Sequence, residues 1–155
     1  MNQNQAPEEG SPCDIVSSRW FDVPSERVFA AFSDPRLLAR WWGPNEFTNE
    51  IEEFDFRPGG TWRVVMCAPD GSRFENQSAF VEIEPGARIV FDHLGPMHPF
   101  RMTMTYVAEG TGTRLTWRMT HESAEAAERM RAFVPEANEQ NFDRLLAVLA
   151  DPARI

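Results

Sequence analysis

His93 is the residue whose chemistry and spacing best suit a reactive or binding site in this sequence. It follows Ile89 and Phe91 at a period of two, so in a strand its imidazole shares the face of these apolar side chains. An imidazole at the mouth of a cavity can orient a carbonyl group or transfer a proton near neutral pH. A histidine satisfied by a backbone carbonyl or by water fits the same pattern, so both roles stay open.

Glu75 is the second candidate for catalysis. Glu75, Asn76 and Gln77 interrupt a strand pattern with consecutive polar groups. If Val81 and Ile83 define the inward face, Glu75 and Gln77 share it unless a bulge shifts the register. A carboxylate beside apolar walls has a raised pKa and can act as a general acid or base. The alternative is that this end of the strand projects beyond the core into water.

Other catalytic or cofactor sites find little support. His93, His98 and His121 have spacings that match no compact metal motif, and His98 and His121 are expected in solvated positions. Cys67 falls on the face opposite Met66 with no base beside it, and neither a nucleophile elbow nor a phosphate-binding glycine loop occurs. We therefore expect no metal and no cofactor.

The elements that position these residues include an antiparallel sheet. Short runs between residues 48 and 120 are separated by turn sequences such as Pro69-Asp70-Gly71. Connections this short join antiparallel neighbours, because parallel strands need long crossovers. With a first strand at residues 14–22, the pattern predicts a sheet of six to seven strands.

Helical patterns occur both before and after the segment 48–120 in the sequence. Two short helices are predicted after the first strand, one beginning at Pro24 and one running from Asp34 to Trp41-Trp42. We expect one tryptophan of this pair to pack inward and the other to shape an entrance or a contact surface. A long helix follows Ser123, and Pro135 is expected to kink or split it. The predicted class is α+β, a curved antiparallel sheet wrapped around the long C-terminal helix.

The apolar faces of this sheet and helix are rich in methionine and aromatic residues. Methionine adapts its shape and aromatic rings supply flat contact area, so these side chains suit a pliable pocket. The alternative is a core that they fill completely. The residues expected to line the pocket are Trp62, Met66, His93, Met102, Met104, Trp117, Met119, Met130, Phe133 and Phe142.

Composition limits the partners. The formal charge is −9 and all fifteen cations are arginine, so the surface repels nucleic acid and anionic lipid. No apolar run is long enough for a membrane span and no signal peptide is evident, so we expect no membrane insertion and a cytoplasmic location, where Cys13 and Cys67 stay reduced. Residues 1–12 are predicted to be a disordered tail, and residues 13–151 a single domain. A homodimer stays possible.

Several short sequence motifs follow one another along residues 14–150. They are Pro24-Ser25-Glu26-Arg27-Val28-Phe29-Ala30-Ala31-Phe32, Asp34-Pro35, Trp41-Trp42-Gly43-Pro44, Arg57-Pro58-Gly59-Gly60-Thr61-Trp62, Pro69-Asp70-Gly71, Glu82-Ile83-Glu84-Pro85-Gly86 and Gly112-Thr113-Arg114-Leu115. Together they resemble the START-like superfamily, also called SRPBCC or helix-grip proteins. Within it they resemble the branch related to the activator of heat-shock-protein-90 ATPase. The resemblance implies the fold predicted above and a cavity between the sheet and the long helix.

The resemblance leaves the activity open, because the superfamily includes carriers, receptors and enzymes. The first hypothesis is a protein that binds a small hydrophobic, aromatic or lipid-like molecule, with no chemistry required. The second is an enzyme of the aromatase or cyclase kind that uses the same cavity, with His93 or Glu75 moving protons. The third is a chaperone-associated protein-binding module that uses its surface.

Overall fold

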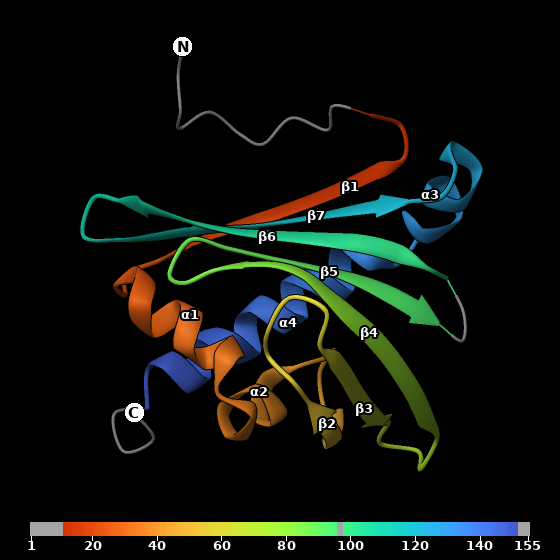
Figure 1. Ribbon diagram of the computed structural model, residues 1–155, viewed down its shortest axis with the longest axis horizontal. Helices are drawn as coiled ribbons and strands as arrows, with labels where there is room; N and C mark the ends of the chain where they lie inside the picture. The colour runs from red at the N-terminus through yellow and green to blue at the C-terminus, as the bar shows by residue number, and fades with distance from the viewer. Residues whose placement is uncertain (1–10, 96–97, 152–155) are drawn as a thin grey trace.

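Seven strands form one antiparallel sheet in the computed structural model, which describes residues 11–95 and 98–151 (Figure 1). The order along the sheet is β1-β7-β6-β5-β4-β3-β2. The strands are β1 (Asp14–Phe21), β2 (Thr48–Phe54), β3 (Thr61–Cys67), β4 (Arg73–Glu84), β5 (Arg88–Gly95), β6 (Phe100–Glu109) and β7 (Gly112–His121). The predicted α+β class and antiparallel meander are confirmed. Residues 1–10 of the predicted tail lie outside the described residues.

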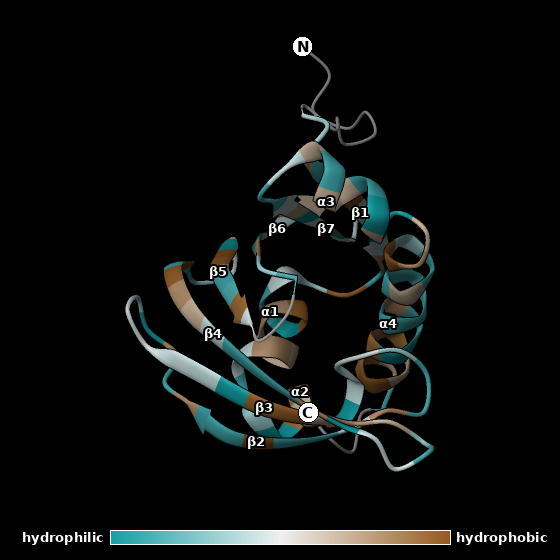
Figure 2. Ribbon diagram, turned by 90° about the vertical axis from the view of Figure 1, so that its right-hand side faces the viewer, coloured by the Kyte–Doolittle hydropathy of each residue, from teal (hydrophilic) through white to brown (hydrophobic). Residues whose placement is uncertain are grey.

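Four helices accompany the sheet in the described part of the chain. The first two, α1 (Ser25–Ser33) and α2 (Pro35–Trp41), connect β1 to β2, while α3 (Ala124–Met130) and α4 (Val134–Leu149) follow β7. Figure 2 shows the sheet curving around α1, with α4 along the open side of the curve. No helix among the described residues combines the length and the apolar character needed to cross a membrane.

Pro135 divides the predicted C-terminal helix. The helical pattern after Ser123 forms α3, stops at residues 131–133 and resumes as α4, whose first turn contains Pro135. A proline fits the first turn because its missing N–H has no helical partner there, whereas an interior proline breaks the helix. The predicted kink or split is therefore a split.

Alternation in β6 and β7 places their large apolar side chains on one face. Met102 pairs with Met119, Met104 with Trp117, and Tyr106 with Leu115 across the two strands. All six side chains are buried, while the residues between them are half-buried or exposed. The period of two therefore predicted the inner face of these strands correctly.

A bulge in β4 reverses the face predicted for Glu75. The β4–β5 register shifts between Phe80 and Glu82, which leaves Val81 as an extra residue that is 40% exposed. The inward residues before the bulge are Asn76, Ser78 and Phe80, so Glu75 and Gln77 lie on the outer face. Inferring their face from Val81 was wrong, because one inserted residue changes the parity of the strand.

Contacts with β1 and β7 hold α4 against the sheet. Arg19 on β1 forms ion pairs of 2.7 Å with Glu139 and with Asp143 on α4. On the inner side, the ring of Phe142 lies 4.7 Å from the ring of Trp117, centroid to centroid. The helix is thus fixed along β1 and β7, and it also packs against α1 and α2.

Candidate functional site

A cavity of about 210 Å³ lies between the sheet and α4. Five strands, α4 and the loop after α2 contribute to its wall. Its lining residues are Trp42, Gly43, Pro44, Trp62, Val64, Met66, Asn76, Ser78, Phe91, His93, Phe100, Met102, Trp117, Met119, Ala137, Asn138 and Asn141. The residues predicted from the sequence that it brings together are Trp62, Met66, His93, Met102, Trp117 and Met119.

Four residues predicted to line the cavity lie elsewhere. Met104 and Phe142 are fully buried in the packed core, and Met130 packs against the edge of that core. Phe133 is 55% exposed, which corrects the expectation that it faces the sheet. It lies in the break between α3 and α4, where the helical phase carried over from α3 no longer applies.

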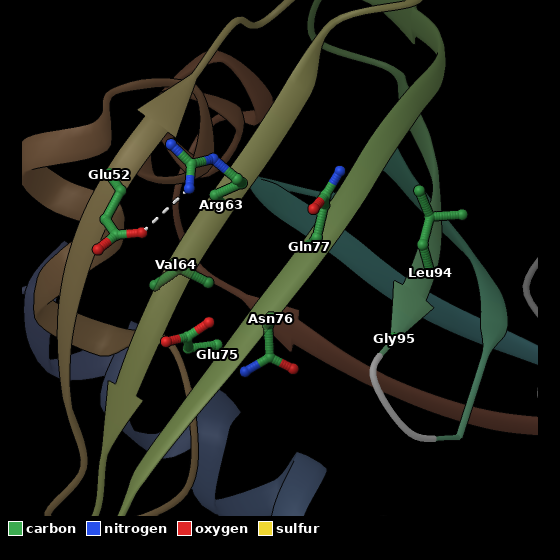
Figure 3. A pocket seen from close by; sticks show the side chains of 8 residues that line it. All are labelled: Glu52, Arg63, Val64, Glu75, Asn76, Gln77, Leu94 and Gly95. Atoms are coloured by element: carbon green, nitrogen blue, oxygen red, sulfur yellow. Dashed lines mark hydrogen bonds and ion pairs between the residues drawn. The ribbon is translucent and has the colours of Figure 1, made fainter.

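Glu75 lines a different, more polar groove on the outer side of the sheet. This groove of about 430 Å³ follows β3 and β4, and Figure 3 shows Glu75, Gln77 and Arg63 along it with the helices behind the strands. The dashed line marks the ion pair of 3.4 Å between Arg63 and Glu52. Glu75 is exposed and separated from the cavity by the sheet, so the two catalytic candidates do not meet.

Aromatic rings form one end of the cavity. The ring of Trp42 lies 5.2 Å from that of Trp62 and 5.4 Å from that of Trp117. Trp41 packs away from the cavity, where its indole Nε1–H donates to the carbonyl oxygen of Ala31 at 2.9 Å. One tryptophan of the pair, Trp41, is buried as expected, and the half-buried Trp42 lines the cavity wall.

Two asparagines on α4 place amide groups at the cavity wall. Asn141 accepts a hydrogen bond from the Gly43 N–H at 3.2 Å and donates to the Trp41 carbonyl at 2.7 Å. Asn138 donates to the Ser17 hydroxyl at 3.1 Å. Sequence reasoning missed both, yet the signal was present, because helical spacing places Asn138 and Asn141 on the same stripe as Phe142.

His93 lies at the other end of the cavity, beside Ser78 on the neighbouring strand. Its ring packs against that of Phe100 with the centroids 5.0 Å apart. Both residues also border a shallow outer groove, so they form the wall between the cavity and the surface. Among the described lining residues, His93 is the one with an ionisable side chain.

His121 corrects another expectation, because it is buried rather than solvated. It is 4% exposed, and its Nδ1 lies 3.3 Å from the carbonyl oxygen of Cys13. Within the described residues, no group of three or more histidine, cysteine, aspartate or glutamate side chains is arranged to hold a metal ion.

The loop between α2 and β2 closes one side of the cavity. Gly43 in this loop has φ +98°, and a Cβ there would lie 2.9 Å from the Met66 methyl group. Arg144 on α4 donates to carbonyl oxygens of the loop, including those of Gly43 and Pro44 at 2.9 Å each. Backbone conformation and a helix side chain together fix this part of the wall.

A family model described as "Activator of Hsp90 ATPase homolog 1-like protein" matches residues 22–150. The chain belongs to this family. The match covers both short helices, the strands from β2 to β7 and α4, so it includes nearly the whole wall of the cavity. The family branch expected from the sequence motifs is thus confirmed. No curated protein is similar enough to count as a match.

Solved structures of bacterial proteins share the fold. A solution NMR structure from Arthrobacter aurescens has a TM-score of 0.85 at 26% identity, covering 96% of this chain and 91% of that chain. A crystal structure from Rhodobacter sphaeroides has a TM-score of 0.83 at 23% identity, covering 91% and 94%. A crystal structure of an AHSA1 protein from Silicibacter pomeroyi has a TM-score of 0.72 at 24% identity, covering 88% and 97%. At these identities the likeness concerns the fold.

Proposed function

We propose that the protein binds a small, largely apolar molecule in the cavity between the sheet and α4. The observation that carries the proposal is the cavity itself, about 210 Å³ of space lined by aromatic and methionine side chains with a few polar groups. Ligand sites combine apolar walls with a small number of placed polar groups in this way. A side-chain-filled core, the alternative considered from the sequence, leaves no such space.

The size of the cavity limits the ligand. An apolar protein cavity of about 150 Å³ accommodates benzene. The larger volume here suits a molecule of two fused rings or a chain of similar bulk, on the order of ten non-hydrogen atoms. At about 0.7 kcal/mol per atom, between the limits for very small and drug-sized ligands, the dissociation constant is on the order of 10 μM.

The lining also favours a neutral ligand. No aspartate, glutamate or arginine is among the described lining residues. Burying a charged group without a partner of opposite charge costs several kcal/mol. A neutral molecule avoids this cost, although the protein as a whole is strongly acidic.

Substitution at Ala137 tests the proposal. Ala137 lines the cavity from α4, so Ala137→Met extends a side chain into the space, whereas Ala147→Met adds the same side chain to an exposed position of the same helix. Naphthalene is the probe, with binding measured by ligand-observed NMR. We expect binding to wild type and to Ala147→Met and a loss of at least tenfold in Ala137→Met. Equal binding to all three proteins, or none to wild type, would refute the proposal.

Native mass spectrometry of the freshly purified protein complements this test. A retained small molecule, released on denaturation, would identify the natural ligand class directly. We expect Ala137→Met to lose this species and Ala147→Met to retain it. Retention by both variants would place the molecule outside the cavity.

A cyclase-like reaction in the same cavity is a second candidate, favoured by the position of His93. The outer-face location of Glu75 leaves the imidazole to move protons without that carboxylate. If a retained molecule is identified, its precursor should be converted by wild type and at least a hundredfold more slowly by His93→Gln. Equal conversion by both proteins would remove His93 from the reaction.

A further inference from the structure

We infer that the ligand carries a hydrogen-bond acceptor, bound by the indole N–H of Trp62 or Trp117. This inference rests on the proposed binding function and specifies the chemical class of the ligand. Trp62 is 2% exposed and Trp117 1% exposed, and both indoles form part of the cavity wall. The Nε1 atoms of both are buried without a hydrogen-bond partner in the described structure.

Buried N–H groups without an acceptor are rare in native proteins. Each is destabilising relative to a hydrogen-bonded group, because it has lost its contact with water and gained no partner. Trp41 shows the usual arrangement, since its Nε1–H donates to the Ala31 carbonyl. Two exceptions on the wall of one cavity indicate that a molecule in that cavity supplies the acceptor.

The unpartnered indole N–H groups require a hydrogen-bond acceptor on the ligand rather than a donor. An indole N–H donates and never accepts. Other buried unpartnered side-chain atoms in the described structure, on Asp14, Arg27, Asn49 and His121, belong to residues outside the cavity wall. A ketone, an aldehyde, a lactone or a ring nitrogen on a small aromatic frame fits the two donors, whereas a purely hydrocarbon ligand leaves them unpaired.

Trp42 packs beside both of these donors. Its ring contacts the rings of both Trp62 and Trp117, and it is half-buried whereas they are fully buried. Because both nitrogens are buried, a ligand atom reaches either one only if a neighbouring side chain shifts, and the half-buried Trp42 is packed against both indoles.

The inference is tested with two molecules of nearly equal shape. Quinoline has a ring nitrogen that accepts a hydrogen bond, and naphthalene has none. The measured quantity is the ratio of their dissociation constants in each protein, because this ratio cancels changes in stability and in cavity volume. We expect Trp62→Phe or Trp117→Phe to shift the ratio about tenfold toward naphthalene, as the loss of one buried hydrogen bond predicts. Trp41→Phe, which removes an indole outside the cavity, should leave it unchanged.

A measurement on the wild-type protein avoids any folding defect of the variants. The five indole N–H groups give separate signals in a ¹H–¹⁵N spectrum. Saturating quinoline should move the Trp62 or Trp117 signal downfield, and naphthalene should move both less, while the Trp41 signal stays in place. If naphthalene and quinoline both bind but neither the ratios nor these signals respond, the acceptor inference is wrong and cavity binding stands. If neither probe binds, both proposals fail.

Discussion

The guanidinium of Arg144, on α4, donates a hydrogen bond of 3.0 Å to the carbonyl oxygen of Trp42 at the end of α2. The same side chain donates to the carbonyl oxygens of Arg40, Gly43, Pro44 and Phe47. Burial lowers the pKa of Arg144, yet an arginine stays charged throughout the accessible pH range. One cation therefore satisfies the orphan carbonyls at the end of a helix and ties the cavity loop to α4.

Replacing this cation should loosen the loop and weaken binding. We expect Arg144→Met to lower the free energy of unfolding by about 3 kcal/mol, because hydrogen bonds to a charged group are lost and carbonyls stay buried. Naphthalene affinity should fall as well, since Trp42 and Gly43 line the cavity. Urea denaturation and ligand-observed NMR give the two quantities. Arg129→Met, at an exposed position of α3, is the control. Comparable losses in both variants would contradict a specific role for Arg144.

Asn141 should depend on its amide group rather than on its size. In Asn141→Asp the oxygen still accepts from Gly43, but a carboxylate oxygen now faces the carbonyl of Trp41. We expect a loss of about 2–3 kcal/mol in the free energy of unfolding at neutral pH. Gln140→Glu makes the same chemical change at a side chain that accepts a hydrogen bond from the Asn45 N–H, and a carboxylate can still accept it. This control variant should therefore lose little free energy of unfolding. Equal stability of the two variants would show that the Trp41 contact contributes nothing.

The strand order and inner faces were predictable because they depend on local signals. Turn sequences marked the strand ends, and a period of two identified Met102, Trp117 and His93 as inward residues. The face of Glu75 was predicted wrongly for a specific reason. The bulge near Val81 changes which of the preceding residues of β4 point inward. Nothing in the sequence marks that bulge with a glycine or proline, so alternation alone could not reveal it.

The cavity itself was harder to predict than the fold. Met66 and Met104 have the same chemistry and the same inward parity, yet Met66 borders the cavity and Met104 is packed in the core. The difference depends on which helix or loop packs over each residue in the tertiary structure, which no local pattern encodes. The polar wall formed by Ser78 and Asn138 was missed for a related reason, because single polar residues are usually assigned to solvent.

Tyr106 makes the stability of the protein sensitive to alkaline pH. It is the one tyrosine of the sequence and is 6% exposed, and burial raises the pKa of its hydroxyl above the ordinary value. A raised folded-state pKa contributes stability that is complete below the unfolded-state pKa of about 10 and is lost as pH rises beyond it. We expect tyrosinate absorbance to develop together with the loss of circular dichroism.

Unfolding in concentrated urea provides the reference for this titration. There the tyrosine should ionise near its ordinary pKa of about 10. Because tryptophan does not titrate in this range, the absorbance change reports Tyr106 alone. Ionisation near pH 10 in a protein that keeps its native circular dichroism would show that the hydroxyl is accessible, contrary to its buried position.

Gly43 is expected to be constrained twice, by its backbone and by Met66. Gly43→Ala places a side chain at φ +98° and brings the new Cβ within 2.9 Å of the Met66 methyl group. Gly71→Ala is a matched control, because its φ of +94° carries the same strain but nothing lies within 4 Å of the Cβ position. A left-handed backbone conformation costs a non-glycine residue about 1–2 kcal/mol, so the free energy of unfolding should fall by this amount in both variants. Gly43→Ala should lose more.

The additional loss of stability in Gly43→Ala, compared with Gly71→Ala, measures how tightly the loop packs on the cavity wall. Met66→Ala removes the contacted methyl group, so it should cancel the excess in the Gly43→Ala background while leaving the backbone cost. A double-mutant cycle with urea denaturation isolates this coupling, which we expect to be about 1 kcal/mol. Zero coupling would mean that the flexible Met66 side chain moves aside at no cost. The cavity wall at this point would then be adaptable, and displacement of Met66 would make room for larger ligands.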